Sequence, residues 1–365
     1  MTRNWSAVAE ELRLALDAPE MSGPPTERRR ARSLPYINLF GRNRVRREHD
    51  LCSHLVQDRA ISDSDRMAIR CGLLALSYCD LHAAMVQGVK RLHGFGVRKG
   101  DRIIVVAESG FQTIALILAL GELETCTLVV NARMPDDELT AIRSSNVHHR
   151  MIYCAGDSSA AAAHSTVEMV RSEFFLFGPV IVQDVAQPRS ARRNRKGPER
   201  PTVSFAEDSR CAGLRHRRLL ESASYLAGTC ALSADDVIYN CAPIANIEGF
   251  LATLMALHAG AGVEFVAEPD PEHFVCRLNE GQVSCLIAPP PFLLEVLAHA
   301  KVNGHILRHR RLRLISSVRE AIDPDLDMAV LDAFGERVRR FDFRKSRRSI
   351  ARHHIETRSM PGEWP

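Results

Sequence analysis

The chain has 365 residues, of which 45% are hydrophobic and 25% charged, and its formal net charge is +4. This is the composition of a soluble globular protein, and the length suggests two domains or two lobes. No apolar run approaches the roughly 20 residues that span a bilayer. The charged N-terminus also lacks the apolar stretch of a secretion signal, so we expect a cytoplasmic protein without a membrane span.

Residues 1–59 are predicted to be a helical extension and a connector. An amphipathic helical pattern covers residues 5–16, a segment rich in Pro and Arg follows it, and residues 50–57 form a second short helical pattern.

Residues 60–187 alternate between strand and helix patterns, which predicts a parallel α/β lobe. A strand is expected from Met67, and Ser77 is a plausible N-cap for the amphipathic helix that follows it. Later elements are expected as strands at 103–107, 127–130, 150–154 and 179–182 and helices at 111–123, 135–145 and 160–172.

A basic, proline-bracketed linker at 188–200 separates this lobe from a second α/β lobe at 201–335, and a basic tail covers 336–365. In the second lobe we expect helices at 216–232, 250–259, 292–300 and 325–334, and strands at 236–239, 263–266, 283–287 and 312–317.

Arginine clusters at 28–30, 192–196, 309–311 and 337–352 carry much of the positive charge. Such runs bind nucleic acid in some proteins and are solvated surface in others. No zinc-finger spacing or aromatic RNA-binding motif accompanies them, so nucleic acid is not the expected partner. The ten cysteines form no CxxC pair, which predicts buried, reduced thiols and no metal site.

The order of elements from Leu76 to Leu139, ending in Asn131-Ala132-Arg133, resembles the N-terminal part of the adenylate-forming (AMP-binding) superfamily. This superfamily includes acyl-CoA synthetases, aryl-acid ligases, luciferases and adenylation domains. The resemblance covers roughly residues 60–335. It implies two stacked α/β lobes like the large N-terminal domain of acyl-CoA synthetases. The family's small C-terminal domain has no counterpart in the sequence.

The resemblance also implies a phosphate-binding loop rich in Ser, Thr and Gly, which ends in a lysine and precedes a helix. Backbone N–H groups, hydroxyls and a cation are what a triphosphate needs. The corresponding place is 205–216, where the loop is shortened, lacks the lysine and carries Glu207 and Asp208. Ser209, Arg215 and His216 are the candidate cofactor-binding residues there.

Two further segments correspond to family elements. Pro243 to Gly249 resembles a segment near the acyl pocket, so Asn246 and Gly249 are candidate pocket residues. Asn246 stands where histidine is common in the family, and an asparagine in a turn also satisfies backbone groups. Ser317 matches the serine of an adenine-binding element and is a further candidate cofactor-binding residue, but Val318 and Arg319 replace the two glycines that follow it.

The family's chemistry activates a carboxylic acid with ATP and magnesium and passes the acyl group to CoA. Because the phosphate loop, the adenine element and the later Tyr-Gly-x-Thr-Glu element are degraded here, the sequence favours a truncated, catalytically impaired family member, a pseudoenzyme. The alternatives are an active acid–CoA or acyl-AMP ligase for a fatty or aryl acid, and a basic nucleic-acid binder. The sequence assigns no catalytic residue.

Overall fold

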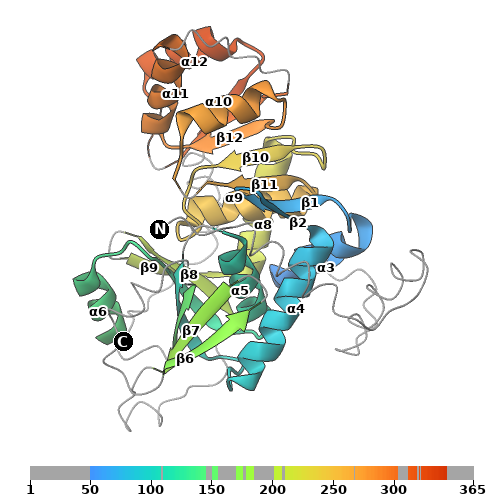
Figure 1. The fold of residues 1–365 in the computed structure, drawn as a ribbon, viewed down its shortest axis with the longest axis vertical. Helices are drawn as coiled ribbons and strands as arrows, with labels where there is room; N and C mark the ends of the chain where they lie inside the picture. The colour runs from blue at the N-terminus through green and yellow to red at the C-terminus, as the bar shows by residue number, and fades with distance from the viewer. Residues whose placement is uncertain are drawn as a thin grey trace, which may run out of the picture.

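Two seven-stranded mixed sheets organise the chain, and helices lie between them and outside them (Figure 1). The structure is a computed structural model. It describes residues 50–107, 110–144, 150–154, 170–175, 178–184, 201–207, 210–266, 268–302, 311–318, 320 and 322–342.

The first sheet has a parallel centre and antiparallel edges. Its strand order is β6 (Val170–Phe175), β7 (Gly178–Asp184), β5 (Arg150–Cys154), β3 (Arg102–Ala107), β4 (Cys126–Asn131), β8 (Thr202–Glu207) and β9 (Arg210–Arg215). The strands β5, β3, β4 and β8 run parallel, whereas β6, β7 and β9 join antiparallel pairs.

The second sheet is parallel except at one edge. Its order is β14 (Arg339–Asp342), β13 (Leu314–Ser317), β12 (Cys285–Ala288), β10 (Val237–Asn240), β11 (Gly262–Phe265), β1 (Met67–Cys71) and β2 (Leu74–Ser77). Among the described strands of this sheet, the edge strand β2 alone is antiparallel to its neighbour.

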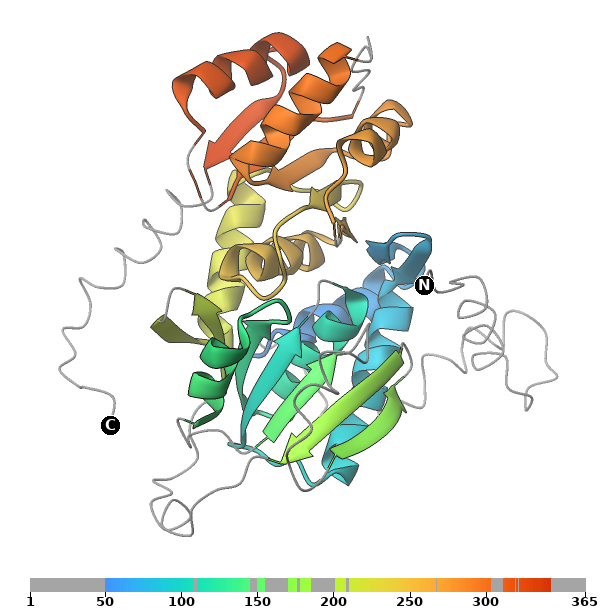
Figure 2. The same ribbon diagram turned by 60° about the vertical axis from the view of Figure 1, so that its left-hand side comes forward.

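The helices form layers around these sheets. They are α3 (Ser53–Ser62), α4 (Tyr78–Gly94), α5 (Phe111–Glu122), α6 (Asp136–Ser144), α8 (His216–Thr229), α9 (Ile247–Ala259), α10 (Pro271–Asn279), α11 (Pro290–Val302) and α12 (Pro324–Phe334). One apolar cluster joins α4, α5, α8 and α9 to the inner faces of both sheets. A second joins α10, α11 and α12 to the outer face of the second sheet (Figure 2), and a third joins α6 to the outer face of the first.

Local sequence explains the central elements. The Ser77 hydroxyl accepts a hydrogen bond from the backbone N–H of Asp80, and the Asp80 carboxylate accepts one from the backbone N–H of Ser77. This capping box starts α4, so the predicted N-cap is confirmed. The helices α5 and α9 are apolar on nearly every side, because both lie inside the central layer and are buried all round.

The predicted α/β class with two sheets is confirmed, but several elements differ from expectation, among them the unpredicted helix α10. Residues 67–77 form two antiparallel strands, β1 and β2, where one strand was expected, because Gly72 adopts a positive φ of 57° and turns the chain. Residues 170–172, the end of the helix expected at 160–172, belong instead to the strand β6, which pairs with β7. Residues 160–169 lie outside the described part, as do 5–16 and 188–200.

The sheets also cross the predicted lobe boundaries. The hairpin β1–β2 falls in the predicted first lobe but pairs with β11 of the second sheet. The hairpin β8–β9 falls in the predicted second lobe but pairs with β4 of the first sheet. The predicted tail begins at residue 336, yet β14 belongs to the second sheet. Strand pairing depends on the free edge that is available in three dimensions, so linear boundaries do not describe it.

Candidate functional site

The candidate site lies at the carboxyl ends of the parallel strands of the second sheet, where open α/β sheets bind ligands. Asn240, Ala288 and Ser317 are the last residues of β10, β12 and β13. The register pairs Ser317 with Ala288. This edge therefore brings Asn240, which precedes the predicted pocket segment, close to the predicted adenine element.

Ser317 is 1% exposed, and its hydroxyl has no hydrogen-bond partner among the described residues. Its neighbour Ser316 is equally buried and equally without a partner. Buried hydroxyls normally make a hydrogen bond, so two such groups without a partner at the end of one strand need an explanation. Val318, which replaces the first family glycine, packs into the central apolar cluster. Arg319 lies outside the described residues.

Asn246 is the N-cap of α9, which begins at Ile247, three residues earlier than expected. Its side chain makes no capping hydrogen bond but is buried at 7% exposure. Gly249 lies in the first turn, and a Cβ atom there would come within 2.2 Å of the Pro243 carbonyl oxygen. The glycine therefore allows the helix to approach the backbone of the preceding segment, and its predicted pocket role stays a prediction.

Asn240 was missed by the sequence analysis. Its side-chain oxygen accepts a hydrogen bond from the Ala242 N–H at 3.0 Å, and its amide nitrogen donates to the Gly249 carbonyl at 3.3 Å. It thereby ties the end of β10 to the first turn of α9. The signal in the sequence was an amide at the end of an apolar strand, directly before Cys-Ala-Pro.

The place of the family's phosphate loop is a β-hairpin. The antiparallel register of β8 and β9 runs from Thr202 opposite Arg215 to Glu207 opposite Arg210. Two residues, Asp208 and the candidate Ser209, connect these strands. Both lie outside the described residues. A triphosphate cradle needs several free backbone N–H groups in succession. Here the antiparallel ladder runs up to the connection, so the described residues of this hairpin form no such succession of free N–H groups.

The candidate cofactor-binding residues Arg215 and His216 are neighbours in the chain but differ in exposure. Arg215 ends β9 and is exposed. His216 begins α8 and is 2% exposed, and its Nδ1 accepts a hydrogen bond from the Cys52 N–H at 3.3 Å. Burial, and to a lesser extent the neighbouring His54, lowers the pKa of His216 to about 4. His216 therefore belongs to the central helix layer, and the structure does not bring it to the sheet edge that carries Ser317.

Neither a metal cluster nor a membrane helix occurs in the described part of the chain. No group of three or more His, Cys, Asp or Glu side chains there could hold a metal ion, and no helix there is long and apolar enough to cross a bilayer. The eight cysteines that can be described are free, and Cys276 alone of these is exposed. Burial raises the pKa of the Cys71 and Cys285 thiols to about 12, so they stay protonated.

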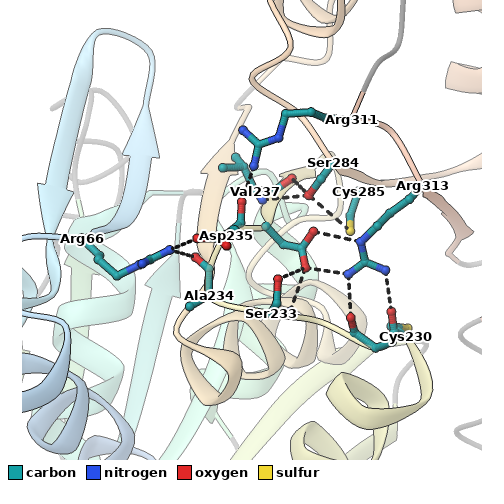
Figure 3. A network of polar contacts seen from close by, with 12 residues as sticks. Arg66, Cys230, Ser233, Ala234, Asp235, Val237, Ser284, Cys285, Arg311 and Arg313 are labelled. Carbon is teal, nitrogen blue, oxygen red and sulfur yellow. Dashed lines mark hydrogen bonds and ion pairs between the residues drawn. The ribbon is translucent and has the colours of Figure 1, made fainter.

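A dense polar network lies at the opposite, amino edge of the second sheet (Figure 3). The guanidinium of Arg313 donates to both carboxylate oxygens of Asp236, at 2.9 and 2.6 Å, and to the carbonyls of Cys230 and Ala231. Arg311 donates to the carbonyls of Asp235 and Gly281. These arginines bind the protein's own backbone, which favours a structural role. The clusters at 28–30 and 192–196 lie outside the described residues.

Comparisons with known proteins agree with this architecture. The family model described as "AMP-binding enzyme" matches residues 211–341. No curated protein sequence matches. Among solved structures, a protein described as a long-chain-fatty-acid CoA ligase from Rhodopseudomonas palustris has a TM-score of 0.63 at 18% identity, over 80% of this chain and 75% of that one.

Two further structures show the same likeness. The N-terminal domain of FACL13 from Mycobacterium tuberculosis has a TM-score of 0.65 at 13% identity, over 80% of this chain and 75% of that one. The unliganded O-succinylbenzoate coenzyme A synthetase from Bacillus subtilis has a TM-score of 0.60 at 14% identity, over 77% of this chain and 57% of that one. The chain thus has the fold of the N-terminal domain of acyl-CoA ligases, and its residues 211–341 are similar to the AMP-binding enzyme family.

Proposed function

We propose that this chain is a catalytically impaired member of the AMP-dependent synthetase/ligase family that keeps the fold and has lost nucleotide activation. The observation that carries the proposal is the β8–β9 hairpin, whose ladder leaves two connecting residues where a phosphate loop would lie. The sequence there also replaces the loop's lysine and introduces Glu207 and Asp208. Two carboxylates repel a triphosphate, and the lysine that would contact it is missing.

Rate arguments support the same proposal. Activation of a carboxylic acid develops negative charge around the α-phosphate, which needs preorganised donors and cations. Removing one such donor costs an enzyme about 100- to 1,000-fold in rate. The loss of several together should bring the rate close to the uncatalysed one.

An active acid–CoA or acyl-AMP ligase is the alternative, and one observation favours it. The buried Ser317 hydroxyl without a partner lies at the sheet edge where a ligand would bind. In this alternative ATP and magnesium are cofactors, a fatty or aryl acid and CoA are substrates, and Asn246 and Gly249 line the acid pocket.

Exchange of labelled pyrophosphate into ATP separates the two proposals. The assay reports formation of the acyl-adenylate alone, so it requires no thioester step. We expect no exchange above background with a panel of fatty and aryl acids, with an active ligase of the same fold as the positive control. Acid-dependent exchange that is lost in Asn246→Ala or Arg215→Ala would overturn the proposal. Calorimetric titration with ATP and magnesium is the companion measurement, and a micromolar dissociation constant would favour the ligase.

A further inference from the structure

The helix α3 is bonded to helices that cover both sheets. At its start, the Cys52 N–H donates to His216 Nδ1 of α8. In its first turn, the Ser53 hydroxyl donates to the Glu122 carboxylate of α5 at 2.7 Å, and Gln57 donates to the same oxygen at 3.3 Å. At its end, Arg59 donates to the carbonyls of Leu257 and His258, which close α9. The helix α3 therefore connects α5, α8 and α9 through hydrogen bonds.

The contact with His216 requires a neutral imidazole. Because Nδ1 accepts from a backbone N–H, the ring proton must sit on Nε2, which is buried and has no partner among the described residues. The ring lies against α5 so closely that a Cβ atom on Gly121 would be 2.6 Å from its Cε1. Little room is left for water to reach the ring while α3 stays in place.

While α3 is in place, which we call the closed arrangement, the groups that face the His216 ring do not stabilise a positive charge on it. The groups that face it are the backbone N–H of Cys52 at the N-cap of α3, His54 from α3 and the neutral surface of Gly121 from α5. Glu122 directly follows Gly121 in the chain, and its carboxylate is 4.0 Å from His54 Nε2. Its negative charge also favours the protonated form of His82 of α4. Arg215, at the N-cap of α8, is exposed. His216 also begins α8, and the positive end of the helix dipole disfavours an added charge.

We propose that His216 is a proton-sensitive latch for α3: protonation of its Nδ1 removes the acceptor of the Cys52 N–H, and α3 separates from α5 and α8. Detachment of α3 exposes the imidazolium to water and opens the contact between the helices of the two sheets. This inference does not depend on the proposed loss of catalysis.

The size of the effect follows from proton linkage. The ring has an ordinary pKa of about 6.5 when it is hydrated, and the pKa is lowered to about 4 in the closed arrangement. Protons therefore favour the open form as the pH falls from 6.5 towards 4. The equilibrium constant for opening should rise about 20-fold between pH 7 and pH 5.

Hydrogen–deuterium exchange of the full chain measures this opening. Peptides that cover α3 are compared with peptides from α11 in the same sample, as protection factors corrected for the intrinsic pH dependence of exchange. We expect the protection of α3 to fall about 20-fold from pH 7 to pH 5 while α11 stays protected. A constant α3, or parallel loss in α3 and α11, overturns the proposal.

Two variants assign the effect to one ring. His216→Gln removes the titrating ring, so its α3 protection should be independent of pH in this range. His82→Gln changes another histidine near Glu122 and should keep the wild-type pH dependence. If His216→Gln still loses α3 protection, or His82→Gln abolishes the loss, His216 is not the latch. The wild-type comparison of α3 with α11 stands without either variant if one of them fails to fold.

Discussion

At the scale of single residues, Gly249 shows how closely the candidate pocket segment is packed. Its Cβ position is 2.2 Å from the Pro243 carbonyl oxygen and 2.7 Å from that of Ala242, both of which are backbone atoms. Gly249→Ala must therefore move α9 or the segment before it. We expect the free energy of unfolding to fall by about 3 kcal/mol, measured by urea denaturation.

The matched control is Gly228→Ala near the end of α8. Apart from its chain neighbours and the backbone of its own helix, a Cβ atom there meets no atom within 4 Å. Alanine has a higher helix propensity than glycine, so this variant should be neutral or more stable by up to about 1 kcal/mol. Equal losses in both variants would show that the backbone contact at Gly249 is not the cause.

The residue scale also shows what sequence could and could not provide at the site. The motif positions placed Ser317 at the end of a strand and Asn246 before a helix, as the structure has them, whereas Gly249 was expected before the helix and lies in its first turn. The sequence placed His216 at the start of a helix, but it could not predict that the ring is buried. That burial depends on Gly121 and Cys52, which lie about 100 and 160 positions away in the chain. Asn240 was missed for the same reason: its two partners exist only after β10 and α9 have docked.

At the scale of elements, α4 provides the sharpest test of a local signal. Its capping box joins Ser77 and Asp80 through reciprocal backbone contacts. Ser77→Ala leaves the Asp80 N–H without its acceptor and should lower the free energy of unfolding by about 1 kcal/mol. Urea denaturation followed by far-ultraviolet circular dichroism measures the change. Ser64→Ala serves as the control, since that hydroxyl is exposed and bonds only to Asp65, and it should change stability by less than about 0.5 kcal/mol.

Elements whose local signals agreed were predicted well, and those whose signals conflicted were not. The strand β4 and the helix α5 have apolar runs of the right length and begin within one residue of expectation. The strand β6 begins at Val170 inside a segment expected to be helical after an alanine-rich run. Pairing with β7 decides its conformation, because β-propensity depends on neighbouring strands more than helix propensity depends on other elements.

At the scale of the whole molecule, the exchange of hairpins between the sheets was not predictable from one sequence. Ile69 pairs with Val263 across almost two hundred residues, and Thr127 pairs with Val203. Both exchanges add a strand pair to a sheet that otherwise comes from the other part of the chain. The alternation of strands and helices indicates parallel sheets, but it does not say which of two free edges a short apolar strand will join.

The Asp236–Arg313 ion pair joins the residues that directly precede β10 and β13 in the second sheet. Asp236 is almost buried and also accepts from the N–H and hydroxyl of Ser233. Burial raises its pKa, but the hydrogen bonds from Arg313 and Ser233 outweigh this and lower the pKa to about 2. Arg313 also donates hydrogen bonds to the carbonyls of Cys230 and Ala231 at the end of α8, which connects this helix to the second sheet.

Asp236→Asn should therefore lower the free energy of unfolding by about 2 kcal/mol at pH 7, less than for a fully buried pair because Arg313 is partly exposed. Its neighbour provides the control: Asp235 pairs with Arg66 on the surface, and Asp235→Asn should cost less than about 1 kcal/mol. Because the folded pKa of Asp236 lies below its ordinary value, its contribution is complete above about pH 4 and is lost as the pH falls towards about 2. The difference between wild type and Asp236→Asn in urea denaturation should shrink over this range. A difference that is constant with pH, or equal losses in the two variants, would mean that the buried carboxylate does not supply the link.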